Sequence, residues 1–271
     1  MSGLPGTGER VGAAPALDPA FLKACCADLW SHPGVRVLAG NHLHPGGRRL
    51  TERALDLLSL PEEATLLDLG SGPGAGAEVA AGRGLTVVAL DLSAAAAAEA
   101  AGTAGVAGVA ADAERLPLRD AALDGALAEC LLSAIPGKGA VADELHRVLR
   151  PASPFVLTDV TRNGPLPGEL DSLIGWIACA RGALTVEGYV RMLEEAGFGV
   201  EHVEDHGHSL VELVAQVRRR LALLQGALAT GVIADLRIPR ELLALGQRML
   251  EAAATAASDG SLSYALVLAR T

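Results

Sequence analysis

A glycine-rich turn directly after an apolar run is the feature that most constrains how this chain folds. Residues 66–75 read Leu-Leu-Asp-Leu-Gly-Ser-Gly-Pro-Gly-Ala. A buried parallel strand that ends in such a turn leads into a helix whose first N–H groups are free to bind a ligand. Glycine at positions 70, 72 and 74 removes the Cβ atoms that would keep a ligand away from the backbone. The stretch predicts an α/β fold with a binding site at this turn.

The glycine spacing fits two classes of ligand. Gly70, Gly72 and Ala75 match G-x-G-x-x-[GA], a pattern typical of nicotinamide and flavin sites. Asp68 extends the pattern to D-x-G-x-G-x-G, which resembles class I S-adenosylmethionine-dependent methyltransferases. An acid suits a cationic ligand better than a pyrophosphate, because a carboxylate repels phosphate oxygens. The resemblance implies that S-adenosylmethionine contacts Asp68, Gly70, Ser71, Gly72 and Gly74.

More acids stand at the ends of the next predicted strands. Asp91 closes residues 85–91 and lies 23 residues after Asp68 (91 − 68). That offset is near the one at which an acid meets a ribose, in S-adenosylmethionine and NAD sites alike. Asp112 follows a strand over 106–111 in the pattern D-A-x-x-L-P, which resembles the adenine-binding segment of the same methyltransferases. Together with a strand over 121–129, the resemblance adds as cofactor contacts Asp91, Leu92, Asp112, Ala113 and Glu129.

The resemblance implies that the remaining chain completes an α/β fold. We expect a Rossmann-like, seven-stranded methyltransferase sheet with an N-terminal helical lid and a helical insertion before the last strand. Further strands are expected over 155–160, 200–208 and 261–270, the last of them antiparallel. The turn before 155 reads Ala152-Ser153, where the family usually has glycines. We expect a disordered lead-in (1–16), a helical lid (17–60), the S-adenosylmethionine-binding core (61–208), a helical insertion (209–258) and a terminal strand (259–271). The insertion would cover the pocket or form a homodimer contact.

His44 and Cys179 are the candidate catalytic residues. His44 precedes Pro-Gly-Gly in the lid, where it could face the substrate or serve the turn. Around Cys179 the chain reads W-x-x-C-x-x-G-A-L, which resembles arsenite methyltransferases of the type-11 group, whose cysteine faces the metalloid. Three thiolates would normally hold As(III), and the family's other cysteine positions are not cysteine here. Other thiols could replace them only if the fold brings them near Cys179; these are Cys25, Cys26 and Cys130.

Other polar residues have two interpretations each. Cys130 and Ser133 follow the fourth strand and are candidate pocket residues. Asp159, at the end of the fifth strand, could reach the acceptor or cap a turn. Three histidines of equal parity could bind metal, but neighbouring acids favour a solvated edge; they are His202, His206 and His208. We predict no metal site.

Composition narrows the partners. The 271-residue chain has a net charge of −10, which disfavours binding to nucleic acid or acidic lipid. It has no apolar stretch long enough to span a membrane and no leader pattern, so we expect a cytoplasmic protein with reduced cysteines. The expected partner is a small-molecule acceptor.

We predict a transferase that moves the sulfonium methyl of S-adenosylmethionine to this acceptor by direct displacement. His44 would take the proton of a hydroxyl or amine, and Cys179 would matter for a thiol or metalloid. Three alternatives remain open: an arsenite methyltransferase, a noncatalytic module that binds S-adenosylmethionine or S-adenosylhomocysteine, and a nicotinamide-dependent oxidoreductase. The last should have a second mononucleotide half or a separate substrate domain.

Overall fold

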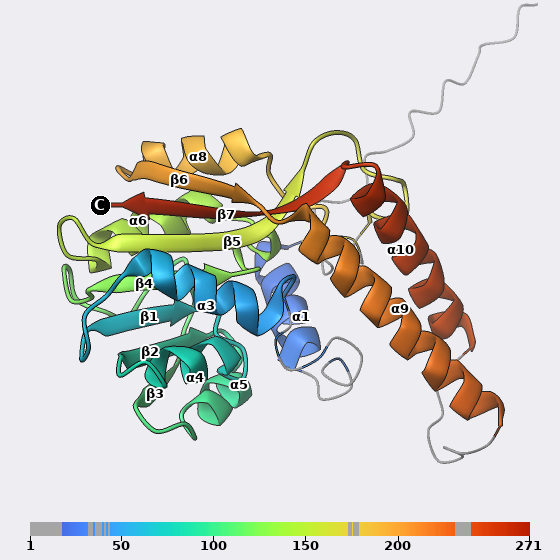
Figure 1. The fold of residues 1–271 in the computed structure, drawn as a ribbon, viewed down its shortest axis with the longest axis horizontal. Helices are drawn as coiled ribbons and strands as arrows, with labels where there is room; N and C mark the ends of the chain where they lie inside the picture. Colours follow the sequence, from blue (N-terminus) through green and yellow to red (C-terminus); the bar gives the residue numbers. More distant parts are fainter. Residues whose placement is uncertain are drawn as a thin grey trace, which may run out of the picture.

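The computed structural model describes residues 18–31, 35, 40, 42, 44–172, 175, 179–230 and 240–271. The expected lead-in over 1–16 and Trp176 of the W-x-x-C pattern lie outside these residues. In the described part, a seven-stranded sheet has the order β3-β2-β1-β4-β5-β7-β6 (Figure 1). Its strands are β1 (Thr65–Leu69), β2 (Thr86–Asp91), β3 (Val106–Ala110), β4 (Gly125–Glu129), β5 (Pro154–Arg162), β6 (Gly199–Asp205) and β7 (Leu262–Arg270).

Five strands of the sheet pair in parallel, and the last strand of the chain, β7, pairs antiparallel with its neighbours. β3, β2, β1, β4 and β5 pair in parallel, so their carboxyl ends meet at one edge of the sheet. β7 is inserted between β5 and β6 and pairs antiparallel with both. The expected antiparallel terminal strand is therefore confirmed. This strand order is typical of class I methyltransferases, and a doubly wound dinucleotide-binding sheet has no such strand.

Helices cover both faces of the sheet and extend past it. They are α1 (Pro19–Ser31), α3 (Gly47–Leu58), α4 (Ala75–Ala81), α5 (Ala94–Ala100), the short 3-10 helix η1 (Leu132–Ala134), α6 (Lys138–Val148), α8 (Val186–Glu195), α9 (Gly207–Ala229) and α10 (Arg240–Ser258). Figure 1 shows α9 and α10 side by side as a hairpin that runs away from the sheet beyond β7. None of the helices described is both long and apolar enough to cross a membrane.

Alternating strand residues feed two separate cores. Leu66 of β1 and Leu127 of β4 pack in one core with α3, α4 and the α9–α10 hairpin. Leu67, which follows Leu66, and Ala126, which precedes Leu127, pack in the other core with α6 and α8. Because successive side chains of a strand point to opposite faces, the near-continuous apolar runs supply both layers at once.

Two turns differ from expectation. The fourth strand begins at Gly125 and not at residue 121, because Ala121 adopts a left-handed φ of 47° and Leu123 forms only an isolated bridge with Leu149. The turn before β5 is tight although it lacks the usual glycine, since Ala152 itself takes a φ of 62°. A non-glycine residue pays a steric penalty in that region, which the packed strands on either side impose.

Candidate functional site

The turn between β1 and α4 leaves one glycine open to a ligand. Gly70, Gly72 and Gly74 have φ values of 72°, 52° and 93°. A Cβ at Gly70 would lie 2.6 Å from Leu131 Cδ1, and one at Gly74 would lie 2.8 Å from Ala100 Cβ. A Cβ at Gly72 would meet nothing within 4 Å among the described residues. The first and third glycines therefore allow close packing of the chain, and the second faces open space.

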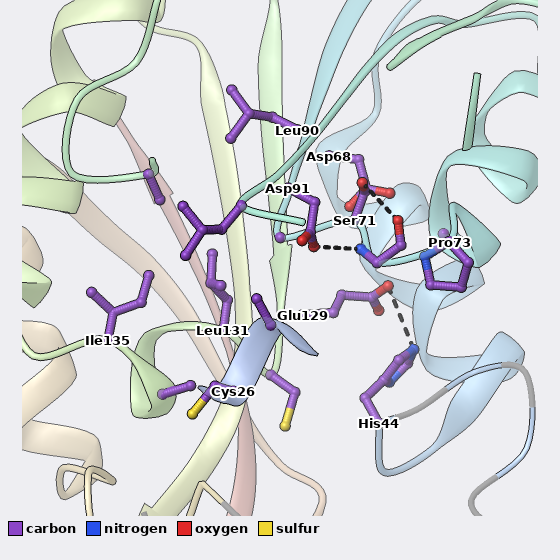
Figure 2. A pocket seen from close by; sticks show the side chains of 18 of the residues that line it. Cys26, His44, Asp68, Ser71, Pro73, Leu90, Asp91, Glu129, Leu131 and Ile135 are labelled. Carbon is purple, nitrogen blue, oxygen red and sulfur yellow. Dashed lines mark hydrogen bonds and ion pairs between the residues drawn. The ribbon is translucent and has the colours of Figure 1, made fainter. Parts of the chain in front are cut away.

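Asp91 holds this turn from the neighbouring strand. Its carboxylate accepts from the backbone N–H of Gly72 at 2.9 Å and from that of Ser93 at 2.8 Å. Burial raises the pKa of Asp91, and these two N–H groups act in the opposite direction. The side chain still lines the pocket at the carboxyl edge of the sheet (Figure 2). It can therefore meet a ligand that lies across the turn.

Two buried carboxyl groups face each other across the first turn of α4. A Cβ at Gly76 would lie 3.1 Å from Glu129 Oε2 and 3.2 Å from Asp68 Oδ2. Asp68 is 3% exposed, and its Oδ2 has no hydrogen-bond partner among the described residues. The second such buried atom in the described chain is His42 Nδ1. Asp68 and His42 line the same pocket, so both of these buried atoms could form hydrogen bonds with a ligand there.

Glu129 is held by two side chains. The hydroxyl of Thr51, in α3, donates to both carboxylate oxygens at 3.0 and 3.1 Å. His44 Nε2 lies 3.5 Å from Glu129 Oε2, and Figure 2 shows the imidazole pointing at the carboxyl group. His44 Nδ1 lies 3.0 Å from the carbonyl oxygen of Pro45, to which it donates. The predicted base and the predicted cofactor contact are therefore neighbours.

Burial disfavours the charged forms of Asp68, Glu129 and His44. It raises the pKa of Asp68 to about 8, helped by the nearby carboxyl of Glu129, while the N–H of Ala77 opposes the shift. Burial also raises the pKa of Glu129 to about 8, against the hydrogen bond from Thr51. For His44, burial lowers the pKa to about 4. Without a ligand, burial therefore favours the neutral form of all three side chains.

Helix α1, which lies in the expected lid, contributes side chains to the pocket. Lys23 Nζ lies 2.5 Å from Asp112 Oδ2 and 3.1 Å from Glu114 Oε2. Burial raises the pKa of Asp112, but the bond to Lys23 outweighs it and leaves the pKa below its ordinary value. Cys26 and Ala27, on the same face of α1, also line the pocket. The expected lid thus contacts the expected adenine-binding acid.

Three of the four thiols come together. Cys26, Cys130 and Cys179 all line the pocket, whereas Cys25 does not. The neighbouring thiol of Cys179, together with burial, raises the pKa of Cys130 well above its ordinary value. Cys130 and Cys179 both have left-handed backbones, with φ of 54° and 63°. Even so, the described residues contain no group of His, Cys, Asp or Glu side chains with the spacing of a metal site.

Most predicted site residues meet in this pocket. It is lined by His44, Asp68, Gly70, Ser71, Gly72, Asp91, Leu92, Asp112, Ala113, Glu129, Cys130 and Cys179. Gly74 and Ser133 do not line it. Asp159 accepts from Ser133 N at 2.9 Å, Ser133 Oγ at 2.5 Å and Val160 N at 2.7 Å, so it fixes η1 and caps the turn.

The three histidines in and after β6 do not line the pocket; they are His202, His206 and His208. His202 Nε2 and His206 Nε2 each lie 2.9 Å from a carboxylate oxygen of Glu204, which also pairs with Arg53 of α3 at 2.5 Å. This arrangement is the polar strand edge that the neighbouring acids predicted. It ties α3 to β6 and places no side chain in the pocket.

Part of the chain that contains this site is similar to a known protein family. Residues 67–157 match the family described as methyltransferase domain. These residues run from β1 to β5 and contain the glycine turn, Asp91, Asp112 and Glu129. Over residues 67–157 the chain is therefore similar to a methyltransferase domain.

Curated and solved relatives resemble this chain over different lengths. Arsenite methyltransferase of Halobacterium salinarum is 37% identical over 87 residues, which span 31% of this chain and only 22% of that protein. Phosphoethanolamine N-methyltransferase 2 of Haemonchus contortus, solved with S-adenosyl-L-methionine, has a TM-score of 0.74 at 18% identity over 95% of this chain and 60% of its own. The [4+2]-cyclase SpnF has a TM-score of 0.71 at 24% identity, over 96% of this chain and 99% of its own. At these identities the structural likeness establishes the fold alone.

Sequence reasoning missed three residues around the pocket. Thr51 is fully buried against Glu129, but the amphipathic pattern of residues 50–58 marked only apolar positions. Gly76 follows the G-x-G-x-G pattern and escaped notice. Lys23 lies in the lid, so its pairing with Asp112 depends on how α1 docks. A polar residue at a core position of α3 was the one signal available in advance.

Proposed function

We propose that this protein is an S-adenosylmethionine-dependent methyltransferase that acts on a small-molecule acceptor. The observation that carries the proposal is the pair of buried carboxyl groups, Asp68 and Glu129, one of them with an unpartnered oxygen, at the glycine turn of the segment that is similar to a methyltransferase domain. Buried carboxyl groups without a cation are costly, so their presence favours a positively charged ligand.

The residues present fit that cofactor. Asp68 and Glu129 would face its positive charges, the open backbone of Gly72 would accept close contact, and Asp91 would accept from its ribose hydroxyls. Asp112, Ala113 and Leu92 would flank its adenine. When bound, S-adenosylmethionine supplies a methyl group already activated by the sulfonium charge. The protein's own contribution is then to align the acceptor and exclude water.

The remaining pocket favours an acceptor without negative charge. Apolar and thiol side chains line much of it: Cys26, Cys130, Leu131, Ala134, Ile135 and Cys179. Lys23 is the one lysine or arginine among the described residues that line the pocket, and it is paired with Asp112 and Glu114. A phosphate or carboxylate on the acceptor would be repelled by the acidic side chains of the pocket and would have no unpaired lysine or arginine among the described residues there to bind.

Incubation with methyl-labelled S-adenosylmethionine and a panel of amine, thiol, hydroxyl and arsenite acceptors tests the proposal. We expect saturable cofactor binding and label transfer to at least one uncharged or cationic acceptor. Tight binding without any transfer would instead support the noncatalytic module. Because the [4+2]-cyclase shares this fold, products should also be checked for rearrangement without methylation.

A second candidate, arsenite methylation, is favoured by the thiols. Cys26, Cys130 and Cys179 line one pocket although two of them occupy positions that the resemblance did not suggest. Soft thiolates suit a trivalent metalloid. Arsenite should then bind to the protein. Cys179→Ser should abolish this binding, and Cys25→Ser should not. Equal arsenite affinity in both variants would contradict this candidate.

A further inference from the structure

Glu129 ends β4 and lies in the pocket without a fixed positive charge beside it. Thr51 donates to both of its oxygens, and its nearest nitrogen base is His44 Nε2, at 3.5 Å. Among the described residues, no lysine or arginine forms an ion pair with Glu129 or with Asp68. Nothing in this surrounding compensates a permanent negative charge on the carboxyl group.

The geometry around His44 places a proton in this group of side chains. Pro45 offers a carbonyl oxygen, which can only accept, so His44 Nδ1 carries the hydrogen of the neutral ring. His44 Nε2 then presents a lone pair, which lies 3.3 Å from Thr51 Oγ1 and 3.5 Å from Glu129 Oε2. The hydroxyl of Thr51 has one hydrogen for three acceptor atoms, namely His44 Nε2 and the two oxygens of Glu129, so an ionised Glu129 leaves lone pairs that repel each other. A protonated Glu129 removes the repulsion, and the raised pKa of Glu129 agrees with this arrangement.

The other titratable groups near Glu129 offer no positive charge to compensate its ionisation. Asp68 lies across Gly76, and the charge of Asp91 acts on Asp68. Cys130 follows in the chain, and Tyr264 of β7 is close enough for the charge of Glu129 to raise its pKa. All four are acids, so the hydroxyl of Thr51 is the neighbour that favours the ionised form. A cationic ligand would reverse this balance.

We propose that Glu129 is the proton acceptor of methyl transfer, and that the disappearance of the donor's positive charge moves the acceptor's proton onto it. The inference rests on the proposed function and deepens it. Glu129 loses its proton when the cationic donor enters the pocket and regains one when the sulfur becomes neutral. Thr51 and His44 are positioning residues in this account, although the sequence predicted His44 as the base.

The step balances without a further reactant. A bond forms between the acceptor heteroatom and the methyl carbon, and the carbon–sulfur bond breaks with its electron pair remaining on sulfur. The proton of the heteroatom moves to the Glu129 carboxylate. One positive and one negative charge are thereby lost together. The reacting atom of the substrate must carry hydrogen, so the class is an amine, a thiol or a hydroxyl compound.

Proton counting by calorimetry tests this inference without knowing the acceptor. S-adenosylmethionine and S-adenosylhomocysteine would be titrated into the full chain at pH 7 in buffers of different ionisation enthalpy. The wild type should release about one proton more with S-adenosylmethionine than with S-adenosylhomocysteine. In Glu129→Gln this difference should vanish while both ligands still bind. Glu52→Gln, a substitution at a solvent-facing acid next to Thr51, should keep the difference.

Thr51→Val supplies a second, independent measurement. Without the donated hydrogen bond, Glu129 should ionise less readily, so the pH at which the proton difference is half its maximum should rise. Equal proton release for the two ligands in the wild type would overturn the inference, as would a full difference in Glu129→Gln. If Glu129→Gln does not fold, an unchanged pH midpoint in Thr51→Val overturns it. Absence of binding by either ligand contradicts the proposed function itself, which is a distinct result.

Discussion

Asp68 and Glu129 set the electrostatics of the pocket at the scale of single residues. Both carboxyl groups are buried, and both have a pKa of about 8, against ordinary values near 4. Each folded-state pKa is raised, so each group favours folding below its unfolded pKa and loses that contribution as pH rises toward 8. The unliganded protein should therefore weaken on the alkaline side, whereas a bound cation should restore it.

Replacing Glu129 by glutamine should stabilise the unliganded protein at high pH. The amide keeps an oxygen for the Thr51 hydroxyl but never has to ionise in a buried place. We expect Glu129→Gln to be more stable than the wild type by about 2 kcal/mol at pH 8.5, and by much less at pH 5. Urea unfolding at the two pH values measures the difference. A variant less stable than the wild type at pH 8.5 would contradict a protonated Glu129 in the free protein.

Gly76 should matter for the ligand and hardly for the fold. In Gly76→Ala the new methyl group would lie 3.1 and 3.2 Å from the two carboxyl groups, where we place the cofactor's charge. Alanine also favours a helix by about 1 kcal/mol over glycine, which offsets part of the cost of these two close contacts, so thermal stability should change little. S-adenosylmethionine affinity should fall about tenfold or more. Gly226→Ala, in an open position of α9, should gain the same helix propensity and leave affinity unchanged.

At the scale of elements, Lys23 ties α1 to the segment that follows β3. The Lys23 side chain is 12% exposed and bridges Asp112 and Glu114, on the segment that follows β3. Lys23→Ala should release the helix by about 1 kcal/mol. Hydrogen exchange of α1 amides should then accelerate several-fold, and S-adenosylmethionine should dissociate faster. The surface pair of Arg270 and Glu201 gives a control, since Arg270→Ala should leave exchange in α1 unaltered.

The loop that carries Cys179 is fixed by close backbone contact with η1. A Cβ at Gly182 would lie 1.9 Å from the carbonyl oxygen of Ser133, so Gly182→Ala must displace the loop. We expect a loss of about 2 kcal/mol or more in stability and faster modification of Cys179 by a thiol reagent. Gly164→Ala meets nothing within 4 Å and serves as the control. Unaltered thiol reactivity in Gly182→Ala would show that the loop does not depend on this contact.

Over the whole molecule, the sequence was most informative where local pattern and fold agree. Apolar runs that end in Asp68, Asp91 and Glu129 predicted three strands and the edge at which their acids meet. The same reasoning could not place Thr51 against Glu129 or Lys23 against Asp112, because those contacts join segments 78 and 89 residues apart. It also misjudged the start of β4, since the left-handed turn at Ala121 has no glycine to mark it.

The function proposed for this protein depends on one positively charged ligand in this pocket. Its most direct test is the affinity of S-adenosylmethionine for the wild type and for Asp68→Asn, measured by calorimetry at pH 8. We predict single-site binding to the wild type and at least tenfold weaker binding to Asp68→Asn, because an amide cannot supply the charge that faces the cation. Equal affinities for the two proteins, or no binding to the wild type, would contradict the account.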